Sequence, residues 1–185
     1  NEKIKESKFV NKVWKLWYHA LYRIGLRNYT KPHNPTIKKY LLQILKKTSS
    51  PIVIETGCIR SPTEGTESTL IISSTLRGRG TFYTFEISKK NIMICKELCK
   101  DYDQHINYVE GDSVQNLKRM VEENVLDRVH FAFFDSVNDA YHIWREFKAV
   151  ESLFKENSII VVDDALWGKK GELIKPHLEG SSEWK

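Results

Sequence analysis

Acidic residues stand at the ends of five short apolar runs in this sequence, where they could bind a ligand that carries positive charge or hydroxyl groups. A carboxylate only accepts hydrogen bonds, so it recognises ammonium groups, hydroxyls and cations. In an open parallel sheet, ligands bind beyond the carboxyl ends of the strands. We therefore expect one binding site along one edge of a sheet, formed by the ends of the five runs: Glu55-Thr56-Gly57, Glu86, Gly111-Asp112-Ser113, Asp135-Ser136 and Asp163-Asp164.

Glu86 and Asp112 suit the two halves of a nucleoside. A carboxylate at the end of the second run can accept hydrogen bonds from two neighbouring ribose hydroxyls. Asp112, after the third run, can serve an adenine amino group. Each residue also has a simpler interpretation, because Glu86 precedes a helix expected at Ser88, and Asp112 can cap the helix that follows it. Both interpretations stay open for both residues.

The segment after the first run favours a ligand with an ammonium and a sulfonium group over a dinucleotide. It begins Glu55-Thr56-Gly57-Cys58-Ile59-Arg60, and Gly65-Thr66-Glu67-Ser68-Thr69 then opens a helix. A dinucleotide site needs a G-x-G-x-x-G run that sets a pyrophosphate on the helix N-terminus, and this segment has none. A carboxylate such as Glu55 suits a positively charged ligand instead.

Alternating strands and helices must hold these residues at one edge. Apolar runs predict strands at 52–54, 81–85, 106–109, 129–134 and 158–162, and the spacing between them predicts helices at 66–76, 88–102, 113–123 and 139–154. Asn34 and Pro35 signal a further helix before the first strand. This rhythm predicts an α/β fold with a Rossmann-like, doubly wound, mainly parallel sheet that is flanked by helices.

The order and spacing of these motifs resemble the class I S-adenosylmethionine-dependent methyltransferases, and within them the metal-assisted O-methyltransferases of the macrocin and catechol type. The resemblance implies that Glu55, Thr56, Gly57 and Ser68 border the methionine end of the cofactor and that Glu86 holds its ribose. It implies that Asp112 and Ser113 border the adenine, and that Asp135 lies against the cofactor. It covers roughly residues 35 to 180 and rests on Ile54-Glu55-Thr56-Gly57, Phe85-Glu86, Glu110-Gly111-Asp112-Ser113, Phe134-Asp135 and Val161-Val162-Asp163-Asp164.

The resemblance also implies a metal site formed by Asp135, Asp163 and Asp164. Three carboxylates at neighbouring strand ends repel one another unless a cation or another partner lies between them. Hard oxygen ligands favour Mg²⁺, with manganese or calcium as alternatives. Such an ion would bind a substrate hydroxyl, lower its pKa and hold its oxygen in line with the methyl group. In the alternative interpretation, Asp163 and Asp164 cap a turn and bind no metal.

The sequence departs from this family at two places, and both bear on catalysis more than on cofactor binding. Catechol-type enzymes carry a lysine as general base three residues after the metal-binding aspartate, whereas Asn138 stands here. Asp135 and His142 are the catalytic candidates that remain, although His142 can equally be a surface or packing residue. A complete methyltransferase sheet ends in an antiparallel hairpin. After Asp164 we expect only a helix at 171–178 and the start of a sixth strand at 182–185, and thus an incomplete hairpin.

The predicted activity is methylation of a hydroxyl group on a small molecule or sugar. Trp144, Trp167 and Trp184 could line the acceptor pocket, although Trp144 has the helical spacing of a core residue with Phe147. Two alternatives stay open. One is a methyltransferase-like protein that binds the cofactor without turnover, and the other is a nicotinamide-dependent enzyme, which the missing glycine fingerprint disfavours.

Charge and composition exclude several other classes of protein. Residues 1–31 carry eight lysines and arginines against two glutamates, while the remainder of this 185-residue chain is near neutral, so we expect no specific nucleic-acid partner. We expect residues 1–34 to form a basic arm with an amphipathic helix that packs on the 35–185 domain or on a partner subunit of a homo-oligomer. Binding to a membrane surface or to an acidic partner is the less favoured alternative. No apolar run has the length of a membrane span. Three cysteines without metal-site spacing fit reduced thiols in the cytoplasm.

Overall fold

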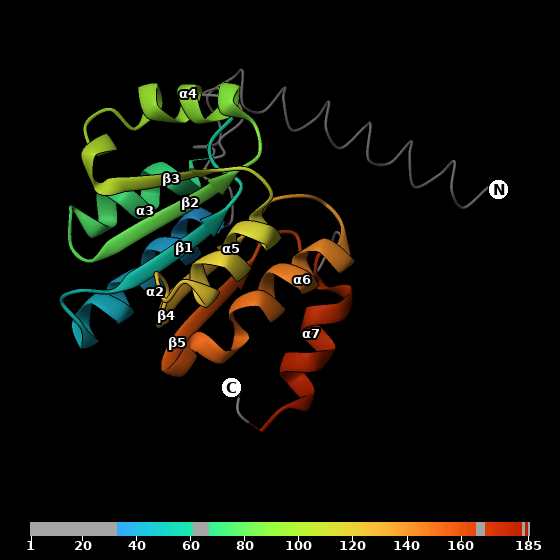
Figure 1. Ribbon diagram of the computed structural model, residues 1–185. Helices are drawn as coiled ribbons and strands as arrows, with labels where there is room; N and C mark the ends of the chain where they lie inside the picture. Colours follow the sequence, from blue (N-terminus) through green and yellow to red (C-terminus); the bar gives the residue numbers. More distant parts are fainter. Residues whose placement is uncertain (1–32, 61–66, 166–168, 183, 185) are drawn as a thin grey trace, which may run out of the picture. The chain divides into compact units, whose positions relative to one another are not determined.

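Strands and helices alternate along the chain in the expected order in the computed structural model, which describes residues 33–60, 67–165, 169–182 and 184 (Figure 1). The α/β prediction is confirmed, and the helix expected within residues 1–34 lies outside the described residues. The strands are β1 (Ile52–Thr56), β2 (Thr81–Glu86), β3 (Ile106–Glu110), β4 (Val129–Phe134) and β5 (Phe154–Val162). The helices are α2 (His33–Lys47), α3 (Ser68–Leu76), α4 (Lys89–Leu98), α5 (Ser113–Glu122), α6 (Ala140–Val150) and α7 (Gly171–Gly180).

The five strands form one parallel sheet in the order β3-β2-β1-β4-β5. The chain order reverses between β1 and β4, and such a switch point is where open α/β sheets bind their ligands. The register also aligns the strand ends. Thr56 lies opposite both Phe85 and Phe134, and Phe134 lies opposite Val162. The predicted meeting of the strand ends at one edge is therefore confirmed.

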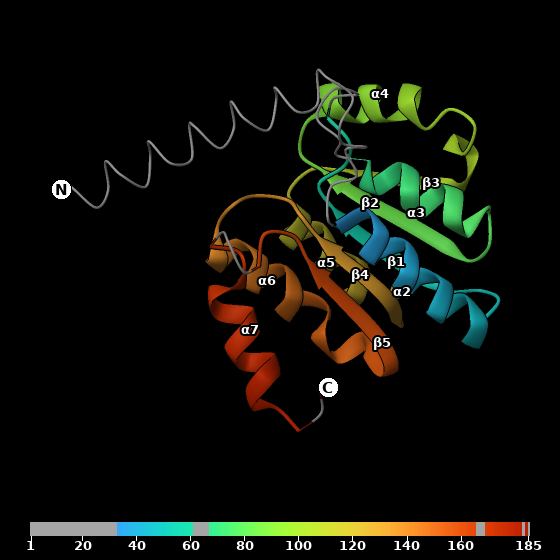
Figure 2. The same cartoon turned by 180° about the vertical axis from the view of Figure 1, so that it is seen from behind.

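Helices cover both faces of the sheet, as the two views in Figures 1 and 2 show. Successive residues of β4 point to opposite faces. Phe131 and Phe133 pack in one buried cluster with residues of α2, α3 and α4, and Ala132 and Phe134 pack in a second cluster with residues of α5, α6 and α7. A strand that is buried on both faces needs an almost continuous apolar run. Its residues reach a ligand only beyond the strand end.

Strand β5 begins earlier than predicted. We expected it at 158, but it starts at Phe154, after α6 ends at Val150 and a short 3-10 helix follows. The first part of the strand was missed because the residues after Phe154 are polar and give no apolar run. The pairing with β4 is irregular in the same part. Asn157 has a left-handed backbone (φ 71°), and the Ser158 hydroxyl donates a hydrogen bond to the Val129 carbonyl at 2.6 Å.

Beyond β5, the described chain continues into α7, which lies alongside α6 in both Figure 1 and Figure 2. The predicted helix at 171–178 is confirmed, and the described residues after it contain no strand. Trp184 packs against Phe154 with ring centroids 5.5 Å apart, and Phe154 is the first residue of β5. Trp184 is thus at the end of β5 opposite to the predicted site and does not line it. Trp144 packs on Phe147 as a core residue, and Trp167 lies outside the described residues.

Candidate cofactor and acceptor site

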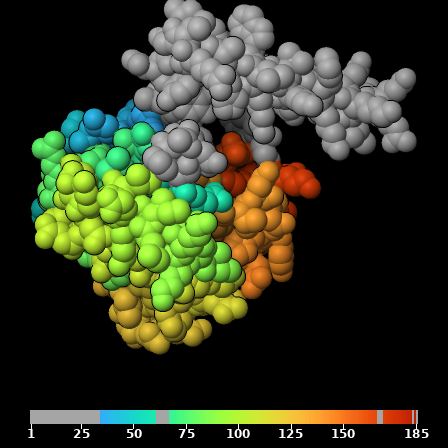
Figure 3. Space-filling view, turned by 90° about the horizontal axis from the view of Figure 1, so that it is seen from above, coloured from blue at the N-terminus to red at the C-terminus, as the bar shows by residue number. Residues whose placement is uncertain are grey.

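A cavity of about 310 Å³ lies beyond the carboxyl ends of β1, β2, β3 and β4. Seen from above in Figure 3, the blue-green segment that follows β1 lies between the green chain around α4 and the orange α6. Backbone and side chains share the lining. The described residues that line it are Gly57, Phe85, Glu86, Ile87, Gly111, Asp112, Ser113, Ser136, Val137 and His142.

The strand ends are held together by a backbone ladder that extends past the strands. The amide of Gly57 donates to the Phe85 carbonyl at 2.8 Å, and the amide of Asp135 donates to the Thr56 carbonyl at 2.9 Å. Gly57 has φ +85°, and a Cβ atom there would lie 2.5 Å from the Asp135 carbonyl oxygen. A side chain is therefore excluded, and the missing side chain leaves the backbone open to a ligand.

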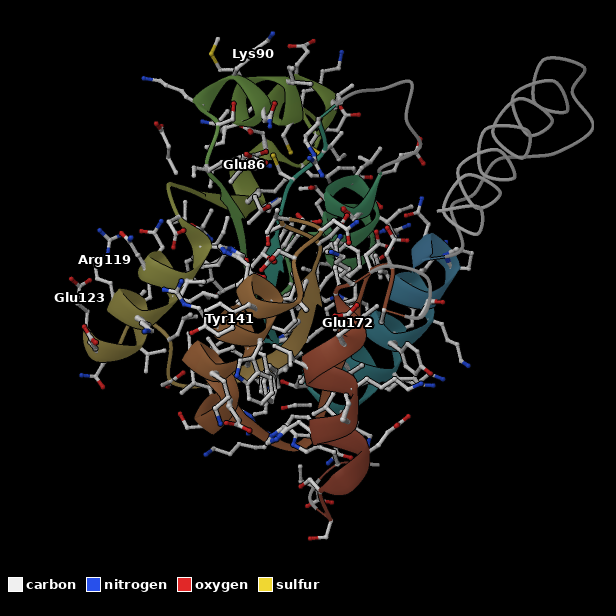
Figure 4. The ribbon with its side chains drawn as sticks, turned by 90° about the vertical axis from the view of Figure 1, so that its right-hand side faces the viewer. Glu86, Lys90, Arg119, Glu123, Tyr141 and Glu172 are labelled. Atoms are coloured by element: carbon white, nitrogen blue, oxygen red, sulfur yellow. The ribbon has the colours of Figure 1, made fainter. Side chains whose placement is uncertain are left out.

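Glu86, the predicted ribose ligand, lies on the wall of the cavity. Its side chain lies beneath α4, the helix that carries Lys90 (Figure 4), and the residue is 7% exposed on the cavity wall. One carboxylate oxygen accepts a hydrogen bond from the Ser88 amide at 2.8 Å, and the other lies 3.8 Å from the Cys58 sulfur. The carboxylate is therefore fixed before any ligand arrives, and its contact with the start of α4 is present as well.

Asp112 caps a helix, as one of its two interpretations predicted, and its contact with an adenine stays a prediction. It caps α5, since its carboxylate accepts a hydrogen bond from the Gln115 amide at 2.8 Å, and it lines the cavity. Nearby, Ser136 presents a buried hydroxyl oxygen that has no hydrogen-bond partner among the described residues. A cavity with one fixed carboxylate, a capping carboxylate and an unpartnered hydroxyl fits a nucleoside cofactor.

A buried hydrogen-bond network supports the floor of this cavity. Glu146 of α6 is fully buried; it accepts hydrogen bonds from the hydroxyls of Thr56, at 3.0 Å, and Ser113. His142 lies 3.3 Å from the same carboxylate and 3.1 Å from the Ser113 hydroxyl. The hydrogen bond to Glu146 raises the pKa of His142, although burial opposes it. Sequence reasoning missed Glu146, although its place four residues after His142 on a helix could have suggested the pair.

Glu55 lies beneath the site rather than on its wall. The residue is 0% exposed, and one carboxylate oxygen accepts hydrogen bonds from the hydroxyls of Thr69, at 2.7 Å, and Thr84, at 2.8 Å. Burial raises the pKa of Glu55 to about 8, despite these hydrogen bonds. A carboxyl group that stays protonated at neutral pH gives an ammonium group no countercharge. That Glu55 binds the methionine end of a cofactor stays a prediction.

Two further predicted cofactor residues, Thr56 and Ser68, are buried and do not line the cavity. The Thr56 hydroxyl donates its hydrogen bond to Glu146, and Ser68 is the first residue of α3. Their contact with the cofactor stays a prediction.

Asp135 and Asp163 come together at the ends of β4 and β5, and the ammonium group of Lys170 joins them. Lys170 makes an ion pair and hydrogen bond with Asp135, and its nitrogen lies 3.9 Å from an Asp163 oxygen. Burial raises the pKa of Asp135 to about 6, the charge of Asp163 raises it further, and Lys170 opposes the shift. Sequence reasoning did not include Lys170.

The predicted magnesium ligands fit a metal ion poorly. Asp164 is exposed and has a left-handed backbone (φ 51°), and the described residues contain no group of three acidic, histidine or cysteine side chains that could hold a metal ion. Asp135 and Asp163 are close together, but they already share a cation supplied by the chain itself. The three-aspartate metal site stays a prediction, and we derive no step from it.

The fold and the site define a class I methyltransferase that uses S-adenosylmethionine. The chain belongs to the O-methyltransferase family, whose model matches residues 33–182. By sequence, no curated protein matches the chain. None of the helices in the described part of the chain has the length and apolar character that a membrane crossing requires.

Several solved methyltransferase structures share this fold. The chain is similar to CalS11, a TDP-rhamnose 3'-O-methyltransferase of calicheamicin biosynthesis (TM-score 0.65, 17% identity, covering 84% of this chain and 74% of that one). It is similar to PaMTH1 from Podospora anserina bound to S-adenosylhomocysteine (TM-score 0.55, 21% identity, 75% and 54%). It is also similar to MycE of mycinamycin biosynthesis in complex with Mg, S-adenosylhomocysteine and mycinamycin VI (TM-score 0.54, 15% identity, 76% and 37%).

Proposed function

We propose that this methyltransferase transfers the methyl group of S-adenosylmethionine to a hydroxyl group on a small molecule or sugar. The acceptor oxygen forms the new bond to the methyl carbon while the bond from carbon to sulfur breaks, and the sulfur keeps the electron pair. The products are S-adenosylhomocysteine, a methyl ether and the proton of the hydroxyl group. The protein mainly holds the two reactants in line.

One observation carries the cofactor half of this proposal. The Glu86 carboxylate faces a cavity at the switch point of the sheet while its contact with the Ser88 amide holds it in place. In this position it can accept hydrogen bonds from both ribose hydroxyls. Asp112 and Ser113 then lie where the adenine is bound, and the unpartnered Ser136 hydroxyl is available to the ligand.

The acceptor half rests on Asp135, which follows the strand next to β1 and is 9% exposed. Its pKa of about 6 leaves it mostly ionised at neutral pH, so its carboxylate can accept the proton that the acceptor hydroxyl loses. His142 lines the cofactor cavity instead, and Glu146 and Ser113 already hold it. We therefore prefer Asp135 to His142 as the base.

The class of acceptor comes from two similar structures. CalS11 acts on a TDP-rhamnose, and MycE was solved with mycinamycin VI, so sugar hydroxyls are the first acceptors to test. The MycE structure contains Mg, and a magnesium ion at Asp135, Asp163 and Asp164 is the alternative to a transfer that uses no metal. Three free, buried cysteines suit a reducing compartment, for which we propose the cytoplasm.

Calorimetry followed by a turnover assay tests this function. We expect S-adenosylhomocysteine to bind with micromolar affinity, NADH not to compete with it, and methyl transfer from labelled S-adenosylmethionine to appear with a sugar nucleotide or a glycosylated acceptor. Failure of the full chain to bind S-adenosylhomocysteine would refute the proposal. Tight binding without transfer to any hydroxylated acceptor would favour the alternative, in which the protein binds the cofactor without turnover.

A further inference from the structure

A buried lysine ammonium group lies beyond the ends of β4 and β5, beside Asp135, the proposed base; we call this place the acceptor rim. Lys170 is 4% exposed, and its nitrogen contacts Asp135 directly and lies 3.9 Å from Asp163. Removing an ammonium group from water costs several kcal/mol unless good partners replace the water. Two carboxylates at adjacent strand ends provide such partners. A buried and paired charge at a predicted catalytic rim is a candidate for function.

The residues on either side of Lys170 are both held in place by close contacts. The next residue, Gly171, has no room for a side chain, because a Cβ atom there would lie 2.2 Å from the Ala165 carbonyl oxygen in the turn after β5. The amide of Lys169 donates a hydrogen bond to the Asn138 side chain at 3.4 Å. Glu172 lies in the first turn of α7 (Figure 4). The start of α7 is thereby held against the ends of β4 and β5.

Asp135 and Asp163 share one cation, the Lys170 ammonium group. Asp135 and Asp163 together carry two negative charges when ionised, and Lys170 supplies one positive charge between them. Removal of one member of such a buried group leaves an uncompensated charge. A divalent ion and the ammonium group cannot both occupy the space between these two carboxylates. The Lys170 ammonium group therefore lies between two of the three residues for which a magnesium ion was predicted.

An ammonium group has three N–H donors. Asp135 accepts a hydrogen bond from one of these donors, and an oxygen of Asp163 lies 3.9 Å from the nitrogen. A remaining donor can meet the oxygen of an acceptor hydroxyl that enters beside Asp135. Such a hydrogen bond stabilises the negative charge that develops on the oxygen as its proton moves to Asp135, and preorganised donors of this kind lower reaction barriers substantially.

We propose that Lys170 is the cationic group of the acceptor site, which holds Asp135 and Asp163 together and donates a hydrogen bond to the acceptor oxygen in place of a divalent metal ion. This inference rests on the proposed methyl transfer. It makes turnover independent of added metal and dependent on the side chain of Lys170, which directly precedes α7.

The test compares the wild type with Lys170→Met, which keeps a side chain of similar length without its charge, and with the control Lys175→Met on the exposed face of α7. We expect wild-type turnover to be unchanged by EDTA and by added Mg²⁺. Lys170→Met should reduce kcat about 100-fold, as loss of a transition-state donor does, with S-adenosylhomocysteine affinity within about twofold of the wild type because Glu86 is untouched. Lys175→Met should match the wild type in both measurements.

A second readout needs no acceptor substrate. Titration with Mn²⁺, followed by electron paramagnetic resonance, should detect little binding to the wild type and at least about tenfold tighter binding to Lys170→Met, because the two carboxylates lose their internal cation. Tight Mn²⁺ binding to the wild type that Asp163→Asn removes would overturn the inference, as would EDTA-sensitive turnover. Either result would leave methyl transfer itself standing, whereas absence of S-adenosylhomocysteine binding would refute the proposed function instead.

Discussion

The Thr56 hydroxyl donates a hydrogen bond to the Glu146 carboxylate across 3.0 Å, and both residues are fully buried. This contact joins the end of β1 to the middle of α6, residues that are 90 positions apart in the sequence. The same carboxylate holds Ser113 and His142, which line the cofactor cavity. One buried acid therefore positions parts of three elements around the ligand without touching it.

Removal of this acid should damage both stability and cofactor binding. Glu146→Ala removes the buried hydrogen-bond partner of the Thr56 hydroxyl and leaves the Ser113 hydroxyl with His142 alone, so we expect the free energy of unfolding to fall by about 3 kcal/mol. Affinity for S-adenosylhomocysteine should fall about tenfold, because the wall formed by Ser113 and His142 loses its support. Urea unfolding and calorimetry measure the two effects. Glu156→Ala, at an exposed position, is the control, and equal values for both variants would contradict a positioning role.

Loss of the Glu86 carboxylate should weaken cofactor binding selectively. Two hydrogen bonds from ribose hydroxyls to a charged acceptor disappear in Glu86→Ala, and we expect the affinity for S-adenosylhomocysteine to drop about 100-fold. Glu97→Ala removes an exposed acid from the adjacent helix α4 and should leave the affinity unchanged. If Glu86→Ala binds like the wild type, the ribose assignment is wrong.

Gly57 should tolerate no side chain. In Gly57→Ala the new Cβ atom meets the Asp135 carbonyl oxygen at 2.5 Å, in a backbone conformation with φ +85°. We expect a loss of about 2–4 kcal/mol in unfolding free energy and no detectable cofactor binding. Gly180→Ala is the matched control, because nothing lies within 4 Å of a Cβ atom there. Its melting temperature should stay close to that of the wild type.

Stability should decline as the pH rises towards 8, in part because of Glu55. Its pKa is about 8 in the folded protein against 4.5 ordinarily. The folded state therefore binds more protons than the unfolded state between these two values, and its stability falls as the pH rises through this interval. The effect is on the order of a few kcal/mol. Denaturant titrations at several pH values should give a smaller slope for Glu55→Gln, and an identical slope would exclude this role.

The strand ends could be predicted because they depend on local pattern. A short apolar run followed by a carboxylate marks Glu86, Asp112 and Asp135 in the sequence, and the register of a parallel sheet brings them to one edge. The face of the sheet to which the Glu55 side chain points could also have been predicted, because Glu55 lies two residues after Val53 and shares its face of β1. That face is covered by α3, so the side chain is buried beneath the site.

Glu146 and Lys170 could not be predicted in the same way. Glu146 lies between Ile143 and Phe147 on α6, and only the packed sheet makes that position a buried link to β1. Lys170 reaches Asp135 across 35 positions of sequence. That contact depends on the close approach of Gly171 to Ala165, which no periodicity encodes.

Helix α7 runs from Lys170, beside Asp135, to the turn that precedes β5. Lys170 precedes its first turn, whereas His177 contacts Glu151 and the rings of Trp144 and Phe147 further along. Opening of this one segment would withdraw the Lys170 ammonium group from Asp135 and Asp163 while β1 and β2 stay paired, so we expect α7 and these strands to open as separate cooperative units. Amide exchange should then report protection in α7 that varies independently of protection in β1 and β2.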